Sequence, residues 1–102
     1  MILGVGEDGH TASLFPDTDI LEVSDRIARE VWVPRLNTWR FTLTLPVLQK
    51  TPAKYVLAAG ASKREVLNRV RTGADLPITR VTGGEGQCWW LVDREAYENH
   101  RG

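Results

Sequence analysis

The amino-acid sequence predicts a single α/β domain built on a largely parallel sheet. Three segments are runs of apolar residues without strict alternation, which is typical of strands buried on both faces of a sheet. They lie at residues 2–5, 55–59 and 88–92. Segments with helical patterns lie between them, and this alternation favours parallel strands. The 102 residues contain no linker and no internal repeat, so we expect one domain over residues 1–102.

Shorter elements are predicted between the first two buried strands. Residues 11–15 are expected to form one helical turn, because Pro16 cannot continue a helix. Residues 20–23 are expected to form another turn of this kind. Residues 27–33 are rich in β-branched and aromatic side chains, and residues 40–45 alternate polar and apolar, so both are predicted strands.

Proline and capping residues predict the helices. Pro46 fits the first position of a short helix, which must end before Pro52. Ser62 is a suitable N-cap, and Glu65 three residues later completes a capping box for a helix that runs to about Arg71. Thr72 and Gly73 mark the C-terminal end of this helix. Two further short helical segments are expected at residues 76–78 and at residues 94–99, the second capped by Asp93.

Composition excludes several function classes. Thirteen basic and thirteen acidic residues cancel, so no basic excess indicates a nucleic-acid partner. The single cysteine, Cys88, excludes an internal disulfide and a cysteine-rich metal site. No apolar run approaches the ~20 residues that span a bilayer, and no signal peptide is recognisable at the N-terminus. We therefore expect a cytoplasmic protein without a membrane partner.

The glycine-rich segment from Gly4 to Thr11 is where we expect chemistry. Glycines after a strand let the backbone approach a ligand, and N–H groups that enter a helical turn can bind an anion or an oxyanion. His10 lies in this segment, and histidine titrates at about pH 6.5, which suits a general base. A glycine turn with a solvated histidine explains the local composition equally well, since the segment lacks the GxGxxG fingerprint.

A longer stretch of sequence around His10 favours a functional loop over a plain glycine turn. Gly6 to Pro16 reads G-E-D-G-H-T-A-S-L-F-P and closely resembles the 6-phosphogluconolactonase signature G-x-D-G-H-T-A-S-L-F-P. Weaker similarities follow in the family's order at residues 40–46, 60–63 and 88–93. The resemblance implies a partial Rossmann-like fold of the NagB/RpiA type, a largely parallel sheet flanked by helices, with the family's N-terminal half missing. The start of the chain inside a predicted strand supports that expectation, although a short edge strand at the start codon is an alternative.

The resemblance also implies an activity. The family hydrolyses 6-phospho-D-glucono-1,5-lactone to 6-phosphogluconate in the pentose phosphate pathway, without a metal or other cofactor. His10 matches the family's general base, Asp8 would orient or polarise the site, and the Gly9 backbone would shape it. Lys63 matches a lysine that binds the substrate phosphate, and Arg40 is expected to face the substrate.

Simpler interpretations compete with these roles. Asp8 can merely close an Asx-turn, Lys63 can be a solvated surface lysine, and Arg40 can be a surface arginine at a strand end. Cys88 is interpreted as an inert core thiol, and His100, close to the C-terminus, receives no role. The tryptophans are interpreted as core and strand-flanking residues rather than as sugar-stacking platforms: Trp32, Trp39, Trp89 and Trp90.

Three candidate functions are considered, and the first two differ in how they treat the missing half of the family's domain. The family's N-terminal half carries a glycine- and serine-rich phosphate loop and an Asp-Glu-Arg segment, and neither is present here. The chain is therefore an enzyme completed by the missing half, which a separate chain could supply, or a truncated, non-catalytic α/β module. A glucosamine-6-phosphate deaminase-like aldose–ketose isomerase is the third possibility. In the deaminases the residues after D-G-H resemble I-A-F-N-E-P. In this chain residues 11–16 read T-A-S-L-F-P, and this difference favours the lactonase.

Overall fold

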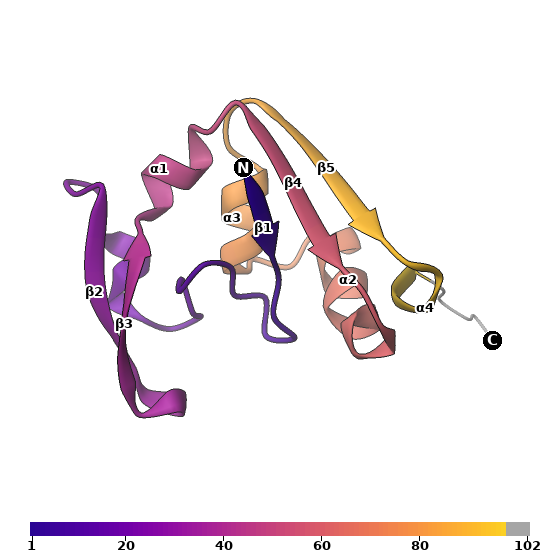
Figure 1. Cartoon of the computed structure of the whole chain (residues 1–102), viewed down its shortest axis with the longest axis horizontal. Coiled ribbons are helices and arrows are strands. Elements are labelled where there is room, and N and C mark those ends of the chain that lie inside the picture. The colour runs from indigo at the N-terminus through magenta and orange to yellow at the C-terminus, as the bar shows by residue number, and fades with distance from the viewer. Residues whose placement is uncertain (98–102) are drawn as a thin grey trace.

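A parallel three-stranded sheet forms one half of the molecule. The computed structural model describes residues 1–97 (Figure 1). In it β1 (Ile2–Gly4), β4 (Ala53–Ala58) and β5 (Gln87–Val92) pair in the order β1-β4-β5, and both pairings are parallel. The three strands predicted from the apolar runs are therefore present and adjacent, and the α/β class is confirmed. The expectation that they are buried on both faces was wrong, because within residues 1–97 one face leaves Ile2, Leu57 and Leu91 exposed.

The other two predicted strands form a separate hairpin. Strands β2 (Ala28–Val33) and β3 (Thr38–Leu43) pair antiparallel with each other and not with the parallel sheet. The short 3-10 helix η2 (Pro34–Leu36) joins them, and Asn37 adopts a left-handed conformation with φ of 51°. So short a connection returns the chain beside the strand it has just left, because a parallel crossover needs a dozen or more residues.

Helices cover one face of the parallel sheet. Sheet residues Val56 and Ala58 pack with Val66 and Leu67 of α2 and with Ile78 of α3 in one buried apolar cluster. A second cluster joins the hairpin, through Val31 and Val33, to α1 and β1. The helical elements are η1 (Asp19–Glu22), α1 (Leu45–Gln49), η3 (Ala61–Lys63), α2 (Arg64–Arg71), α3 (Pro77–Thr82) and α4 (Arg94–Tyr97).

Two local predictions were wrong. Residues 11–15 form no helical turn: Leu14 N–H donates to the Thr11 carbonyl at 2.9 Å in a tight turn, with Ala12 at φ of 52°. Burial of Leu14 and Phe15 in the core decides this conformation, since tertiary packing overrides a local preference. Ser62 does not cap α2, because η3 runs directly into it and no side chain caps the helix.

The predicted helix end at Gly73 is confirmed. Gly73 has φ of 89°, and its N–H donates to the carbonyl of Val70 while Ala74 N–H reaches back to that of Arg69. These two bonds make a Schellman motif, which satisfies the last carbonyls of α2 and requires a left-handed residue.

The tryptophans are less buried than expected. Trp32, Trp39 and Trp89 are 41%, 62% and 42% exposed, so their interpretation as core residues was wrong. They lie on strand faces that nothing covers within residues 1–97. Cys88 is half-buried, and this burial raises the pKa of its thiol, which fits an unreactive cysteine. His100 and the last residues of the helix predicted at 94–99 lie outside the described residues.

A search of residues 1–97 for a helix with the length and apolar character needed to cross a bilayer finds none.

Lys54 is a buried anchor inside β4. Its side chain is fully enclosed, and Nζ donates to the carbonyls of Gln49 at 2.9 Å and Glu85 at 2.5 Å. Lys54 thereby ties the end of α1 and the loop before β5 to the sheet, and it satisfies polar groups that burial would otherwise leave unpaired.

We predict that Lys54→Met lowers the free energy of unfolding by about 1–3 kcal/mol, because the Glu85 carbonyl loses its buried partner. Urea denaturation followed by circular dichroism measures this change. Lys50→Met, at an exposed position nearby, is the control and should leave stability within about 0.5 kcal/mol. Equal effects of the two substitutions would contradict the anchoring role.

Candidate active site

An open cavity of about 370 Å³ lies where the parallel strands end. The loop after β1 and the short helix η3 after β4 both leave the sheet at its carboxyl edge, the usual place for ligands in α/β folds. The hairpin closes the cavity from the other side. Its lining residues are Glu7, Asp8, His10, Ala12, Phe15, Arg35, Leu36, Arg40 and Lys63.

Two glycines allow the loop after β1 to fold tightly. A side chain at Gly6 would place its Cβ 2.2 Å from the ring of His10, so that ring packs against bare backbone. Gly9 has φ of 88°, and a Cβ there would come within 2.8 Å of Leu76. Its carbonyl accepts the N–H of Ile78 at 2.9 Å. Gly9 therefore shapes the loop from behind and is not among the residues that line the cavity.

Asp8 and His10 form a hydrogen-bonded pair. His10 Nδ1 lies 2.6 Å from Asp8 Oδ1, and the backbone N–H of His10 donates to the same oxygen at 3.0 Å. Asp8 thus closes an Asx-turn and, through the same oxygen, also contacts the imidazole. With Nδ1–H bound to a carboxylate, the free lone pair of the neutral ring lies on Nε2. The ring also stacks on Phe15, with centroids 4.1 Å apart.

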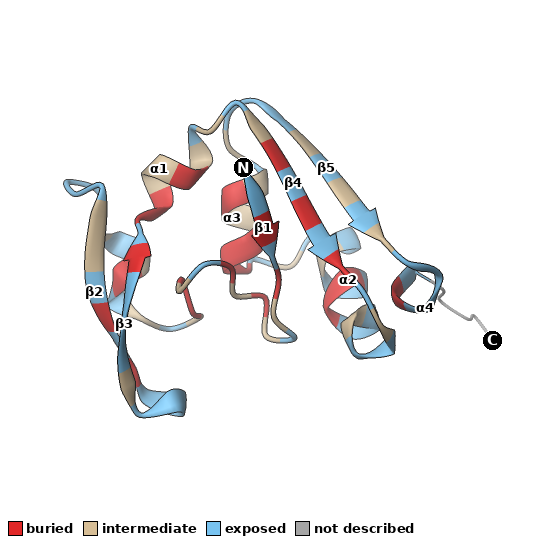
Figure 2. Cartoon of the chain, in the orientation of Figure 1, coloured by how far each residue is buried: buried red, intermediate tan, exposed pale blue. Residues whose placement is uncertain are grey.

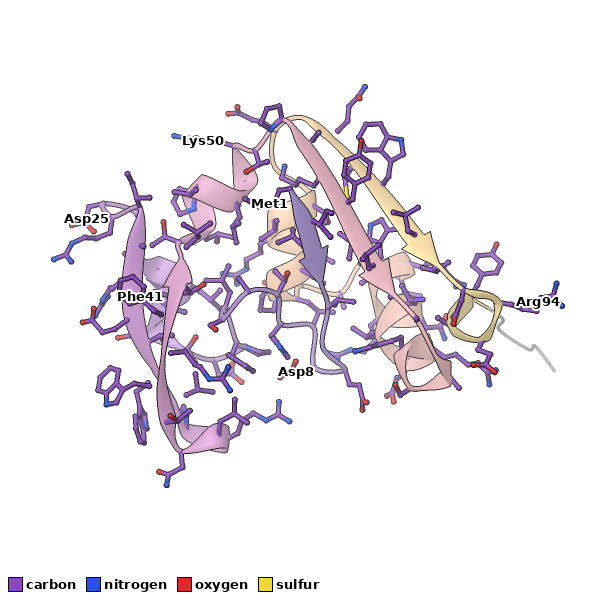
Figure 3. All side chains as sticks on the ribbon, in the orientation of Figure 1. Met1, Asp8, Asp25, Phe41, Lys50 and Arg94 are labelled. Atoms are coloured by element: carbon purple, nitrogen blue, oxygen red, sulfur yellow. The ribbon has the colours of Figure 1, made fainter. Side chains whose placement is uncertain are left out.

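Asp8 is held in its ionised form. Partial burial acts to raise the pKa of Asp8, but the hydrogen bonds from His10 and the positive charge of Arg35 outweigh it and lower the pKa below the ordinary 3.8. A carboxylate rather than a carboxylic acid therefore faces the imidazole at neutral pH. Figure 3 shows Asp8 below the carboxyl end of β1, on the side away from Met1.

Arg35 belongs to the site although the sequence analysis missed it. Its guanidinium Nη1 donates to Asp8 Oδ2. Arg35 lies in η2, at the turn of the hairpin, 27 residues along the chain from Asp8. Its position in a proline-containing turn carries no local signal of this pairing. The contact depends on how the hairpin packs beside the sheet.

Lys63 lines the cavity from η3, the short helix that follows β4. Its Nζ donates to the carbonyl of Val5 at 2.7 Å, which fixes the ammonium beside the end of β1. Asp93 holds the start of this connection, since its carboxylate accepts the N–H groups of Gly60 and Ala96, and these bonds lower the pKa of Asp93. The predicted cap of α4 thus also positions the segment that carries Lys63.

The structure brings four of the five predicted site residues to one cavity. Asp8, His10, Arg40 and Lys63 all line it, and Arg35 joins them. The cavity is thus lined by three cationic side chains and by only two carboxylates, those of Glu7 and Asp8, and this positive excess suits an anionic ligand. Among residues 1–97, no group of three or more His, Cys, Asp and Glu side chains is arranged to hold a metal ion.

The chain is similar in sequence to known proteins. A sequence profile of the family described as Glucosamine-6-phosphate isomerases/6-phosphogluconolactonase matches residues 1–90. The 6-phosphogluconolactonase of Synechocystis sp. is 37% identical over 107 residues, covering 99% of this chain and 42% of that relative. The Homo sapiens protein of the same name is 38% identical over 100 residues, covering 94% and 39%.

A solved relative shares the fold. The crystal structure of 6-phosphogluconolactonase from Leishmania guyanensis has a TM-score of 0.80 and 31% identity, covering 99% of this chain and 41% of that chain. This chain thus spans about 40% of the length of the curated relatives it matches. Because the profile extends over most of its residues, the chain belongs to the glucosamine-6-phosphate isomerase and 6-phosphogluconolactonase family.

Proposed function

We propose that this chain supplies the general base and phosphate-binding lysine of a 6-phosphogluconolactonase, which hydrolyses 6-phospho-D-glucono-1,5-lactone to 6-phosphogluconate. The observation that carries the proposal is the Asp8–His10 pair, 2.6 Å apart, in a cavity that Lys63 and Arg40 also line. The curated relatives that bear the lactonase name support this reaction over sugar-phosphate deamination.

The proposed chemistry begins with water. His10 Nε2 takes a proton as the water oxygen bonds to the lactone carbonyl carbon, which gives a tetrahedral oxyanion. The bond from that carbon to the ring oxygen then breaks, and the imidazolium returns its proton to the departing oxygen. Ionised Asp8 keeps Nδ1 protonated and stabilises the imidazolium between these steps. No metal ion takes part in this proposal.

The cationic side chains bind the substrate's phosphate. Lys63 uses one of its N–H donors on the Val5 carbonyl, so two remain for phosphate oxygens. Arg40 lies on β3 across the cavity and supplies a second positive charge. Arg35 is paired with Asp8 and acts as a positioning residue for the base.

Full activity requires the rest of the family's domain. The cavity is open, and the chain spans only about 40% of the relatives' length. We propose that the remaining part, in the same polypeptide or as a separate chain, completes the substrate pocket. The competing function, a non-catalytic module, predicts no lactone hydrolysis even when that part is supplied.

We predict that His10→Asn lowers kcat by about 10²–10⁴-fold and leaves KM largely unchanged, because it removes the base but keeps a polar side chain. The assay follows lactone opening above its spontaneous rate, with this chain joined to the complementary part of the Synechocystis relative. Asp25→Asn, at an exposed loop position, is the control and should retain full activity. An unchanged rate in His10→Asn would remove this residue from the mechanism.

We predict that Lys63→Ala mainly raises KM for the phosphorylated lactone, because the phosphate loses its ammonium partner. The same variant should hydrolyse unphosphorylated gluconolactone about as well as the parent protein. Lys50→Ala is the matched control, since Lys50 is an exposed lysine that is not among the residues lining the cavity. Equal losses on both substrates would show that Lys63 serves the fold and not the phosphate.

We predict that Asp8→Asn destabilises the chain at pH 7 and loses this effect in acid. The folded pKa of Asp8 lies below its unfolded value, so its ionisation stabilises the fold above pH 3.8 and that contribution disappears as pH falls through the lowered folded pKa. Melting temperatures between pH 7 and pH 2.5 measure the gap between parent and variant. A gap that persists unchanged to pH 2.5 would contradict the ionised pair.

A further inference from the structure

The proposed hydrolysis leaves one developing charge without a partner. When water adds to the lactone carbonyl carbon, the carbonyl oxygen becomes an oxyanion, which a fixed hydrogen-bond donor can stabilise. Arg35 is bound to Asp8, while Lys63 and Arg40 serve the phosphate in the proposed function. Backbone N–H groups beside the base are the donors that remain.

Ala12 lines both cavities that meet at the base. The cavity described above and a second one of about 370 Å³ share His10, Ala12 and Lys63. Residues of β1 and of the loop after it form the rest of the second cavity. Ala12 lies two residues beyond the base and is exposed. A ligand in either cavity therefore has access both to the imidazole and to the backbone of Ala12.

The backbone of Ala12 is held in an unfavourable conformation. Leu14 N–H closes a two-residue turn on the Thr11 carbonyl at 2.9 Å, and of the two central residues only Ala12 has a positive φ, at 52°. This is the pattern of a II′ turn, whose first central position favours glycine. Backbone strain of this kind clusters at functional sites and persists where the surrounding structure enforces it.

Buried contacts on both sides enforce the turn. Leu14 is fully buried and Thr11 is 1% exposed, with Oγ1 of Thr11 donating to the Gly4 carbonyl at 2.8 Å. Ser13 N–H donates to Thr42 Oγ1 of the hairpin at 3.2 Å. The loop after β1 therefore contains buried stretches although it has no helix or strand there (Figure 2). The turn is anchored to β1 and to the hairpin, so its exposed peptide groups are fixed before a ligand binds.

The N–H group of Ala12 is available to a ligand. Within residues 1–97 it donates to no acceptor, whereas the N–H groups of His10, Ser13 and Leu14 all donate to protein oxygens. A donor held in place by the fold needs no reorganisation as charge develops, and this is the physical basis of an oxyanion hole. Arg40, by contrast, has a long side chain and lines only the first cavity.

We propose that the backbone N–H of Ala12 donates to the lactone carbonyl oxygen as that oxygen becomes an oxyanion. The inference rests on the proposed function and adds this donor to it. The imidazole of His10 takes the proton of the attacking water, and the N–H of Ala12 stabilises the charge that the attack creates. When the bond to the ring oxygen breaks, the carbonyl double bond forms again and the hydrogen bond weakens, so the interaction is strongest in the transition state.

A backbone ester at position 12 tests this donor. Lactic acid in place of Ala12 keeps the methyl group but puts an oxygen where the N–H was. The ester is made in the chain joined to the complementary part of the Synechocystis relative. We expect kcat for the lactone to fall about 10²–10³-fold with KM largely unchanged. Ala12→Gly keeps the N–H and suits the positive φ, so it should retain most of the parent's kcat.

A second ester separates the donor from the stability of the turn. Replacing Leu14 with its hydroxy-acid analogue removes the hydrogen bond that closes the turn but keeps the N–H of Ala12. We expect this ester to lower the melting temperature more than the ester at position 12, and to lower kcat less. The opposite order of kcat would overturn the inference, because the N–H of Ala12 would then serve only the fold.

The remaining outcomes distinguish this inference from the proposed function. An active parent whose kcat is unchanged by the ester at position 12 would overturn the donor role and leave the proposed function in place; Arg40 would then be the donor to examine by Arg40→Gln. A rise in KM alone would also overturn it, since the N–H would bind the ground state. A parent without lactonase activity would overturn the proposed function, and this inference with it.

Discussion

The carboxylate of Asp8 connects the parts of the molecule that form the site. It accepts a hydrogen bond from the backbone of His10, another from the imidazole of His10 and a third from Arg35. The first two fold the loop after β1, and the third ties that loop to the hairpin. Because the hairpin belongs to a different sheet, this charged contact at the cavity adds to the apolar cluster that packs the hairpin against β1.

The glycines around this carboxylate serve different physical ends. Gly6 leaves room for the imidazole, and Gly9 supplies a left-handed turn against Leu76. Gly4 has no such internal reason, and it lies at the border between the sheet face and the site.

Both the candidate site and one face of the parallel sheet leave side chains exposed to solvent. Positive charge gathers around an open cavity at Lys63, Arg35 and Arg40. The exposed face of the parallel sheet carries Tyr55, Trp89 and Leu91. A parallel sheet covered on one face retains half of its apolar surface in water, which disfavours the isolated chain. Packing of further family domain on this face would bury that surface and enclose the charges, strengthening their interactions with an anion.

The sequence by itself determined the three strands of the parallel sheet, the Schellman end of α2, and the loop residues Asp8 and His10, because apolar runs, glycines and a long specific string are local features. The tertiary structure alone decided the rest. It turned residues 11–15 from the predicted helical turn into a tight turn, made the other two strands a separate hairpin, and brought Arg35 to Asp8. These outcomes depend on contacts between residues far apart in sequence, and such contacts leave no local pattern to read.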